Sequence, residues 1–547
     1  MAFIYSRNNL IGRQKALGRF FEILPGALSW LLLIGMFILS FKASFIAALI
    51  MIAFILYWVM RLFYMNIFLI ISYVRLAVEA RTDWMERIRD VDNVEAFCRS
   101  SFPAERVSSW RERRSRSIHR GLLTGLMKSG CLPPKSSEIC HLVIIPVIKE
   151  CRAVVEPGIR GIVEGGFPAK QVLLVIALED AASDSVKDDM RALAAAYKAY
   201  FLDLVIITHP CDLPGEARVK GANCTYAAKK AAEFFTVRGM ALKNIVVSCF
   251  DADTSSLSDY LSCLTYHYLI TPDRNRSSYQ PIPVYHNNIW EAPSFARVME
   301  IGTSFFQMIE STNPCKLVTF SSHSMSFSAL VEIGYWPVDM ISDDSAVFWK
   351  ALIHYKGQYR VVPMYTTLSM DIAIGQGWWK TMVSIYKQKR RWAWGVENFA
   401  VVARAFFEQS GIPLAQRIVY ITKLLDTFVS WATWSFLLAI ISWLPTIFAS
   451  REFTTSTAYY ALPRIKGTIF GLASIGVIVC MVLSYSLLPR EAGWRHLGRR
   501  ILHLFEWLFM PAFILGLSAF PALDAQTRLM MGWPMVFQVT EKSARKK

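Results

Sequence analysis

Apolar residues in this chain form two kinds of run: long ones toward both ends and short ones in the middle. The long runs are nearly uncharged, and each is close to the roughly 20 residues with which an α-helix crosses a membrane. They cover residues 25–41, 43–60, 427–448, 467–488 and 502–523. The pattern predicts transmembrane helices at both ends of the chain. The last run contains Glu506, Pro511 and Pro521, which predicts either a kinked span or a re-entrant pair of half-helices.

The short apolar runs are rich in β-branched residues and cover residues 141–147, 171–178, 202–208 and 244–250. Continuous hydrophobicity over such a length is typical of strands that are buried on both faces. Helix-like stretches, for example residues 221–235, separate the runs. This alternation predicts an α/β domain around a Rossmann-like, mostly parallel sheet, inserted between the transmembrane helices.

These patterns divide the chain into four parts. We expect a transmembrane hairpin over residues 1–75, a basic amphipathic connecting region over 76–138, the α/β domain with C-terminal interfacial helices over 139–407, and a transmembrane bundle over 408–547. The connecting region is either helical packing around the α/β domain or an amphipathic collar on the membrane.

Basic residues before the first span indicate the orientation of the chain. Arg7, Arg13, Lys15 and Arg19 favour a cytoplasmic N-terminus, because cationic residues collect on that side of a membrane. Two spans then return the chain to the same side. We therefore expect an integral membrane protein of the cytoplasmic or inner membrane, with its α/β domain in the cytosol.

Composition narrows the partners. Hydrophobic residues make up 54% of the chain and the net charge is +17. Because the chain has membrane spans, contact with anionic lipid and the positive-inside bias explain this charge better than nucleic acid does. The sequence holds no nucleic-acid-binding motif, and its ten cysteines include no C-x-x-C pair that would indicate a zinc site.

Three polar segments carry candidate chemistry: Asp251-Ala252-Asp253, Asp343-Asp344 and Gln388-Lys389-Arg390-Arg391-Trp392. The first follows a predicted strand, where two carboxylates suit a divalent cation that bridges diphosphate oxygens. The second offers a base for an attacking hydroxyl, although Ser342 or Asp343 also suits a helix N-cap. The third combines an arginine for phosphate oxygens with an aromatic face, although an interfacial helix alone would also explain it.

In this order the segments resemble the membrane-integrated processive family 2 glycosyltransferases, such as cellulose, chitin, hyaluronan and poly-N-acetylglucosamine synthases. The resemblance covers about residues 140–407 and implies a GT-A-like fold. It implies inverting transfer of a sugar from a nucleotide-sugar donor, with a UDP-sugar expected, to a growing polysaccharide that crosses the membrane. Mg²⁺ or Mn²⁺ is the implied cofactor. The implied partners are the donor, a glycan or lipid-linked acceptor and membrane lipid, with room for partner subunits.

The resemblance also implies residue roles. Asp344 matches the general base, Asp251 the nucleotide contact, and Asp253 a metal ligand, with Asp251 assigned to the metal as well. The donor diphosphate and the acceptor end are assigned to Asp343, Gln388, Arg391 and Trp392. The nucleotide side is assigned to Pro146, Glu150, Glu179 and Lys220.

Several segments depart from the family pattern. Pro146 to Glu150 lacks the Tyr-Asn of P-x-Y-N-E, and Glu179-Asp180 stands where the family has D-D-G-S. Phe320-Ser321-Ser322-His323 replaces F-x-G-T-N, and Ser342-Asp343 replaces Thr-Glu. In the family, these positions face the base, the sugar and the acceptor, so the sequence does not determine which polymer is made.

Two alternatives therefore remain. The first is a transferase that places one sugar on a lipid carrier, and the second is an inactive membrane scaffold. We expect His323 to be a polar wall residue, and Asp339 and Asp371 to be loop residues.

Overall fold

A computed structural model describes residues 3–6, 10–99, 109–130, 132–255, 257–408, 411–489 and 494–535. The chain forms two compact units. We call Ser72–Asn288 together with Phe306–Asp371 the sheet unit. We call Met1–Ile71, Ile289–Phe305 and Ile372–Glu541 the helical unit. Arg7 lies outside the described residues, as do part of the basic loop after residue 489 and the basic C-terminal tail.

A seven-stranded sheet with the strand order β3-β2-β1-β4-β6-β5-β7 organises the sheet unit. Its strands are β1 (Cys140–Val147), β2 (Val172–Glu179), β3 (Asp203–His209), β4 (Ile245–Cys249), β5 (Ser277–Val284), β6 (Ser324–Ser326) and β7 (Arg360–Ser369). Strands β1 to β4 are parallel to one another, β6 is antiparallel to β4 and β5, and β7 is parallel to β5. The predicted mostly parallel α/β sheet is confirmed.

The four strands predicted from apolar runs agree with β1 to β4 to within one residue at each end. All residues of β4, and nearly all of β1 and β2, are buried, which is why their sequences are continuously apolar. The other three strands were not predicted. Strand β5 contains two prolines and two serines, and β6 is only three residues long, so neither has the signature of a buried strand.

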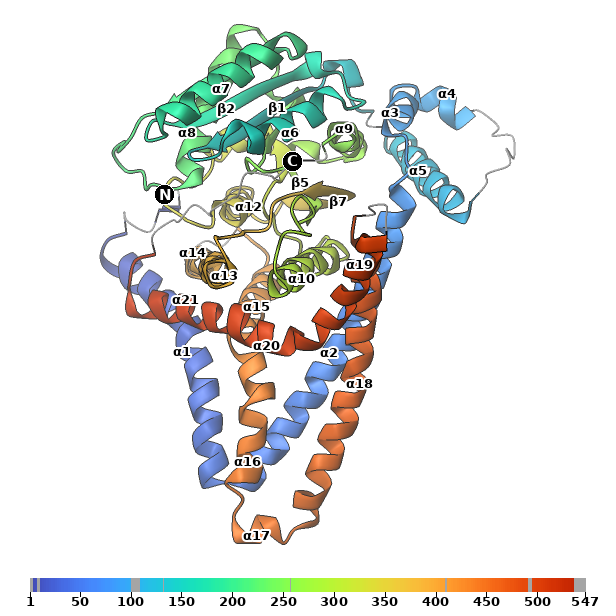
Figure 1. Ribbon diagram of the computed structural model, residues 1–547. Coiled ribbons are helices and arrows are strands. Elements are labelled where there is room, and N and C mark those ends of the chain that lie inside the picture. The colour runs from blue at the N-terminus through green and yellow to red at the C-terminus, as the bar shows by residue number, and fades with distance from the viewer. Residues whose placement is uncertain are drawn as a thin grey trace. The chain divides into compact units, whose positions relative to one another are not determined.

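Helices flank the sheet, as Figure 1 shows. They include α6 (Arg152–Val163), α7 (Asp184–Tyr197), α8 (Lys220–Val237), α9 (Tyr260–Ile270), α11 (Phe327–Glu332) and α12 (Asp343–His354). The connecting region forms α3 (Trp84–Asp92), α4 (Val94–Arg99) and α5 (Trp110–Ser129). Helices α3 and α5 pack against α9, where His119 Nδ1 lies 2.8 Å from the hydroxyl of Tyr266. Of the two predicted alternatives, the structure therefore has helical packing around the α/β domain.

The helical unit contains the membrane helices. Among the described residues, four helical segments are long and apolar enough to cross a membrane: Gly12–Lys42, Ser44–Glu79, Tyr459–Leu487 and Gly498–Met531. Leu414–Ala439 and Ile441–Ile447 form a fifth if this pair, bent by 43°, is one span. The chain is therefore an integral membrane protein, as predicted. In Figure 1 these segments are α1 (Gly12–Lys42), α2 (Ser44–Glu79), α15 (Leu414–Ala439), α16 (Leu444–Ile447) and α18 (Thr457–Leu487), with α17 (Arg451–Thr454) between the last two.

The last apolar run is broken, as its prolines predicted. It forms α19 (Trp494–Glu506), α20 (Met510–Ile514) and α21 (Phe520–Met531), with a π-helical turn at Leu515–Ala519. Pro511 and Pro521 lie in the first turns of α20 and α21, where a missing N–H costs little. Helix α21 passes the middle of α15, where Gln526 Nε2 donates a hydrogen bond to the Phe428 carbonyl oxygen at 2.7 Å. Helices α1 and α21 cross closely, since a Cβ on Gly26 would come within 2.9 Å of the Gln526 carbonyl oxygen.

The helical unit also carries the basic-aromatic motif. The motif lies in α13 (Trp378–Ala393), which is followed by α14 (Glu397–Glu408). Helix α13 packs against α21, and α14 packs against α1. Helix α10 (Ser294–Ser311) begins in the helical unit, and its residues up to Phe305 belong there.

Candidate active site

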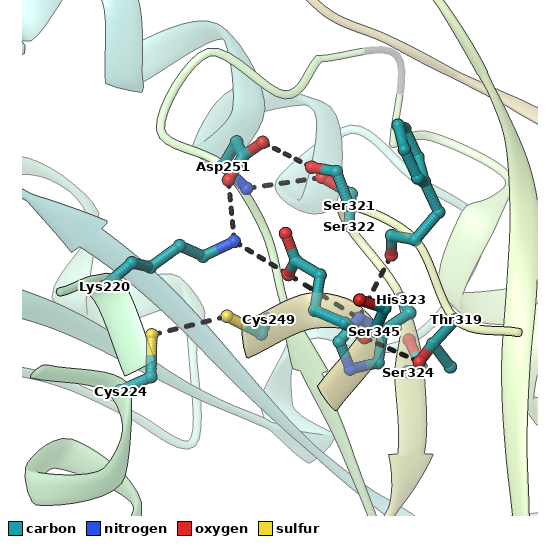
Figure 2. Close-up of polar contacts among 12 residues, drawn as sticks. Lys220, Cys224, Cys249, Asp251, Thr319, Ser321, Ser322, His323, Ser324 and Ser345 are labelled. Atoms are coloured by element: carbon teal, nitrogen blue, oxygen red, sulfur yellow. Dashed lines mark hydrogen bonds and ion pairs between the residues drawn. The ribbon is translucent and has the colours of Figure 1, made fainter. Parts of the chain in front are cut away.

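The two acidic motifs of the sheet unit meet at one lysine. Lys220 is the first residue of α8, and its Nζ donates a hydrogen bond to Asp251 Oδ1 at 2.8 Å (Figure 2). The same ammonium group donates to Asp344 Oδ1 at 3.0 Å. Asp251 follows the carboxyl end of β4, and Asp344 lies in the first turn of α12. The fold thus gathers three predicted site residues where ligands bind to parallel α/β sheets.

Lys220 offsets the repulsion between these two carboxylates. Its side chain is 11% exposed, whereas those of Asp251 and Asp344 are 30% and 26% exposed. Burial by itself lowers the pKa of Lys220, but Asp251 and then Asp344 outweigh that effect and raise the pKa well above the usual value. The lysine is therefore a constant cation at neutral pH, and the two carboxylates beside it remain partly open to solvent.

Two serines of Phe320-Ser321-Ser322-His323, the segment that differs from the family pattern, form hydrogen bonds with Asp251. The hydroxyl of Ser321 donates to Asp251 Oδ2, and the backbone N–H of Asp251 donates to Ser322 Oγ at 3.3 Å (Figure 2). Ser322 has φ of +58°, a left-handed conformation that is strained for a residue other than glycine. The family pattern has glycine at this position. Here the serine hydroxyl compensates by bonding to both Asp251 and Thr254.

His323 borders Asp344 and is buried. Its Nδ1 atom lies 3.8 Å from Asp344 Oδ1 and 3.1 Å from the carbonyl oxygen of Phe320. Burial lowers the pKa of His323, and Asp344 only partly opposes this, so the imidazole is neutral at neutral pH. Its position beside Asp344 agrees with the expectation of a polar wall residue.

Asp343 is buried beneath Asp344, where α8 and α12 approach closely. A Cβ on Gly221 would come within 2.4 Å of the Pro337 carbonyl oxygen and 3.0 Å of Asp343 Cβ. Glycine at the second position of α8 is thus required for this approach. Ser342 occupies the N-cap position of α12, so the predicted helix start is present and directs Asp344 from the first turn.

Asp253 lies deeper than Asp251 and is held by residues that follow β5 and β7. Its Oδ2 accepts a hydrogen bond from the backbone N–H of Asp371 at 3.0 Å. Asn287 donates both to the Asp253 carbonyl oxygen at 2.9 Å and to Asp371 Oδ1 at 2.8 Å. Asp371 follows a loop-like course, as expected, but sequence reasoning missed its contact with the acidic motif. The available signal was an acidic residue just beyond a strand, but β7 itself was not predicted.

The donor atoms of Asp251 and Asp253 suit a hard cation. Both residues offer only carboxylate oxygens, which Mg²⁺ and Mn²⁺ prefer. Within the described ranges, no group of three or more His, Cys, Asp or Glu side chains could hold a metal ion. Mg²⁺ is usually bound by one or two carboxylates together with substrate phosphates. The residues therefore fit a cation that is completed by a diphosphate.

Three of the residues assigned to the nucleotide, Pro146, Glu150 and Glu179, lie at or just beyond the carboxyl ends of β1 and β2. Pro146 is within β1, in register with Ala177 of β2. Glu150 folds back on its own loop and accepts hydrogen bonds from the backbone N–H groups of Ile148 and Lys149. These strand ends share one edge of the sheet with the end of β4.

Glu179, at the end of β2, belongs to a chain of ionisable groups that the sequence did not indicate. His209 Nδ1 lies 3.1 Å from Glu179 Oε2, and His209 Nε2 lies 2.9 Å from Glu216 Oε2. Burial raises the pKa of Glu179, while His209 acts in the opposite direction. A carboxyl held in this way has a defined orientation at the nucleotide edge of the sheet.

Gln388, Arg391 and Trp392 lie on α13 of the helical unit. At about 100° of rotation per residue, Gln388 and Arg391 share one face of that helix. The Oε1 atom of Gln388 is buried and, within the described part of the chain, has no hydrogen-bond partner. The proposed action of these three residues on the donor and acceptor remains a prediction.

Parts of the chain are similar to known glycosyltransferases. The family model described as "Glycosyl transferase family group 2" matches residues 246–488. A stretch of 80 residues is 40% identical to the poly-beta-1,6-N-acetyl-D-glucosamine synthase of Staphylococcus aureus strain COL, covering 15% of this chain and 17% of that protein. The same match occurs for strain N315. The chain thus spans about a sixth of the length of the curated relatives that it matches.

Two solved structures are similar to this chain at low sequence identity. The mannosyltransferase PcManGT from Pyrobaculum calidifontis, in complex with GDP-Man and Mn²⁺, is 13% identical with a TM-score of 0.36 and covers 77% of this chain and 99% of its own. S. aureus TarS 1-349 in complex with UDP-GlcNAc is 11% identical with a TM-score of 0.34 and covers 73% of this chain and 94% of its own.

Residues 246–488 therefore resemble the glycosyltransferases of family group 2, in a chain that also carries helices able to cross a membrane.

Proposed function

We propose that this protein is an inverting synthase that extends a polysaccharide from a UDP-sugar and passes the product across the membrane. The observation that carries the proposal is the meeting of Asp251 and Asp344 at Lys220. It brings the carboxylate expected at the nucleotide next to the carboxylate expected at the acceptor. A single displacement at the sugar carbon between them needs these two groups at close quarters.

Asp344 is the proposed general base. Its carboxylate takes the proton of the acceptor hydroxyl as the hydroxyl oxygen forms a bond to the anomeric carbon of the donor sugar. The bond between that carbon and the phosphate oxygen breaks, and the nucleoside diphosphate leaves with the electron pair. Attack opposite to the leaving group inverts the configuration. The partial exposure of Asp344 leaves it accessible to an acceptor.

Negative charge on the leaving diphosphate requires cations. Asp251 and Asp253 would hold Mg²⁺ or Mn²⁺, and the ion would neutralise charge on the diphosphate oxygens when bound. Lys220 is already placed at Asp251 and adds a permanent charge from the protein. Gln388 and Arg391 are proposed to hold the diphosphate, and Trp392 the acceptor end.

Orientation follows from charge and from the number of spans before the sheet unit. The N-terminal basic residues Arg13, Lys15 and Arg19 favour the cytoplasmic side, and α1 and α2 return the chain to it. A cytosolic active site would meet nucleotide sugars where cells make them. Protease accessibility of the sheet unit in sealed inside-out vesicles, compared with right-side-out vesicles, tests this orientation.

Turnover of defined donors tests the function. The full-length protein in lipid nanodiscs is incubated with UDP-N-acetylglucosamine, UDP-glucose or GDP-mannose and with Mg²⁺ or Mn²⁺, and the product is sized. We expect release of UDP and a product of many sugars, both lost in Asp344→Asn. A product with a single sugar on lipid would replace the polysaccharide proposal with the lipid-carrier alternative. Full turnover by Asp344→Asn would remove the assigned base.

A further inference from the structure

The motif helix α13 carries three consecutive cations, Lys389, Arg390 and Arg391, between Gln388 and Trp392. Family resemblance assigns Gln388, Arg391 and Trp392, and leaves the two intervening positions without a role. Consecutive residues on an α-helix point about 100° apart, so the three cations face three directions. The helical unit supplies distinct partners for two of these directions.

Lys389 points into the protein toward α10. Its Nζ lies 3.0 Å from Glu300 Oε2 and donates to Thr303 Oγ1 at 2.8 Å. The side chains of Lys389 and Glu300 are only 3% and 1% exposed. The same ammonium group lies 3.9 Å from the centre of the Trp392 ring, a cation–π contact within one turn of the helix. Lys389 therefore joins α10 to the aromatic residue of the motif.

Arg390 points toward α21. Its Nη1 lies 2.9 Å from Asp524 Oδ2, and the hydroxyl of Tyr386, one turn earlier on α13, lies 3.4 Å from the same oxygen. Arg528 of α21 contacts the other oxygen of Asp524 at 2.7 Å. Side-chain exposures of 19% for Arg390 and 25% for Asp524 make this pair more open than the Lys389 pair.

We propose that Lys389 and Arg390 are positioning residues that fix α13 between α10 and α21 and thereby set the direction in which Arg391 leaves the helix. Carboxylates of neighbouring helices neutralise the first two cations, and Arg391 shares its face with Gln388. Lys389 additionally sets the ring of Trp392. This inference rests on the proposed function, because it takes the ligand of Arg391 to be the donor diphosphate.

The contact chemistry explains why the two positions need different side chains. A fully buried carboxylate such as Glu300 is costly without a cation, and only the slender ammonium group of lysine reaches it while covering an aromatic ring. The Asp524 pair is half open, which suits the broad guanidinium of Arg390. Exchanging the two residues would place each cation in the wrong environment.

Donor kinetics of variants test the proposal. The full chain in nanodiscs is assayed with UDP-N-acetylglucosamine and Mg²⁺ for kcat, KM and product length, and its thermal unfolding is followed in the same discs. We expect Lys389→Met to lower kcat/KM on the order of 10-fold to 100-fold, since small displacements of a positioned group have effects of that size. The matched control is Lys387→Met, the same change at an exposed lysine of the same helix, with kcat/KM unchanged.

A paired variant separates positioning from folding. Lys389→Met combined with Glu300→Met removes the buried charges together and is expected to restore the unfolding temperature but not kcat/KM, because Trp392 still lacks its cation. Recovery of kcat/KM by the paired variant would overturn the proposal, as would wild-type kinetics in Lys389→Met. If both buried variants fail to fold, Asp524→Asn decides: we expect a donor KM raised about threefold with the protein still folded, and an unchanged KM overturns the proposal.

Failure of the inference is distinguishable from failure of the proposed function. A wild-type protein that turns over no nucleotide sugar contradicts the proposed function, whatever the variants do. A wild-type protein that forms a single-sugar lipid contradicts the polymer, and the kinetic comparison of Lys389 variants is then made on that product. Active wild-type protein with insensitive Lys389 and Asp524 variants contradicts the positioning role alone.

Discussion

Two lysines of this protein pair with carboxylates in opposite ways. At the sheet edge, Lys220 binds Asp251 and Asp344, whose side chains are 30% and 26% exposed. In the helical unit, Lys389 binds Glu300, whose side chain is 1% exposed. The first lysine has two partners that remain open to a ligand, and the second has one partner that is sealed from water.

We interpret this difference as the one between a ligand-binding site and a structural ion pair that holds helices together. A half-exposed carboxylate keeps part of its hydration, so a cation or hydroxyl can replace a neighbour at modest cost. A buried pair cannot open without stranding a charge, and breaking it is strongly destabilising. We therefore expect changes at the sheet edge to affect catalysis mainly, and changes at the buried pair to affect stability as well.

Asp344→Asn should have the largest effect. Loss of a general base is expected to lower kcat about 10²-fold to 10⁴-fold with little change in stability, because the amide keeps the shape of the carboxylate. Initial rates of UDP release at saturating donor measure it. Asp188→Asn, at an exposed position of α7, is the control and should match the wild type. An unaltered kcat in Asp344→Asn would contradict the distinction between solvent-exposed ion pairs that serve catalysis and a buried ion pair that serves stability.

Lys389→Met should cause the largest loss of stability. Stranding Glu300 in the protein interior is expected to cost about 3–5 kcal/mol, whereas removing both members of the pair is expected to be nearly neutral. Thermal unfolding in nanodiscs measures both variants. A loss below about 1 kcal/mol in the single variant would place this pair among ordinary surface ion pairs.

Lys220→Met should affect stability in a pH-dependent manner. The pKa of Lys220 is raised in the folded protein, so its contribution is fully present below the unfolded value of about 10.5 and is lost as pH rises through the folded pKa. The unfolding temperature of the variant should therefore be lower than that of the wild type near neutral pH, with the gap closing above pH 10.5. Lys230→Met, at an exposed position of the same helix, is the control. A gap that persists unchanged at higher pH would argue that Lys220 acts through packing.

Asp524→Asn should have the smallest effect on stability. The pair with Arg390 is partly exposed, so we expect a loss of about 1 kcal/mol or less. Unfolding in the same nanodiscs compares it directly with the Lys389 pair. A loss of stability as large as that of Lys389→Met would show that solvent exposure does not explain the difference between the two ion pairs of α13.

Much of the fold could be predicted, because burial on both faces makes a strand continuously apolar. Strands β1 to β4 were located to within one residue at each end, and the acidic motif was placed correctly at the end of β4. Strands β5 to β7 were not predicted, because prolines, serines and short length obscure the pattern of a buried strand. The contacts of Asn287 and Asp371 with Asp253 were therefore not predicted either.

The sequence identified residues of the candidate site, but it did not predict which of them contact one another. Asp251 and Asp344 were singled out by residue type, position and order. Their shared lysine was assigned to the donor by resemblance alone, and its bond to Asp344 spans 124 positions in the sequence. The chain Glu179–His209–Glu216 has no local pattern at all, since strand pairing brings its members together.

The sequence by itself located the membrane helices and four of the strands through its hydrophobic runs, and the order of its motifs indicated a resemblance to glycosyltransferases. Only the tertiary structure decided which charged side chains are exposed to solvent and which are buried. Lys389 and Arg390 are adjacent cations in the sequence, yet their carboxylates lie 89 and 134 positions away and differ in burial. The strength of a charge pair depends on the water around it, and that environment is created only when distant helices pack.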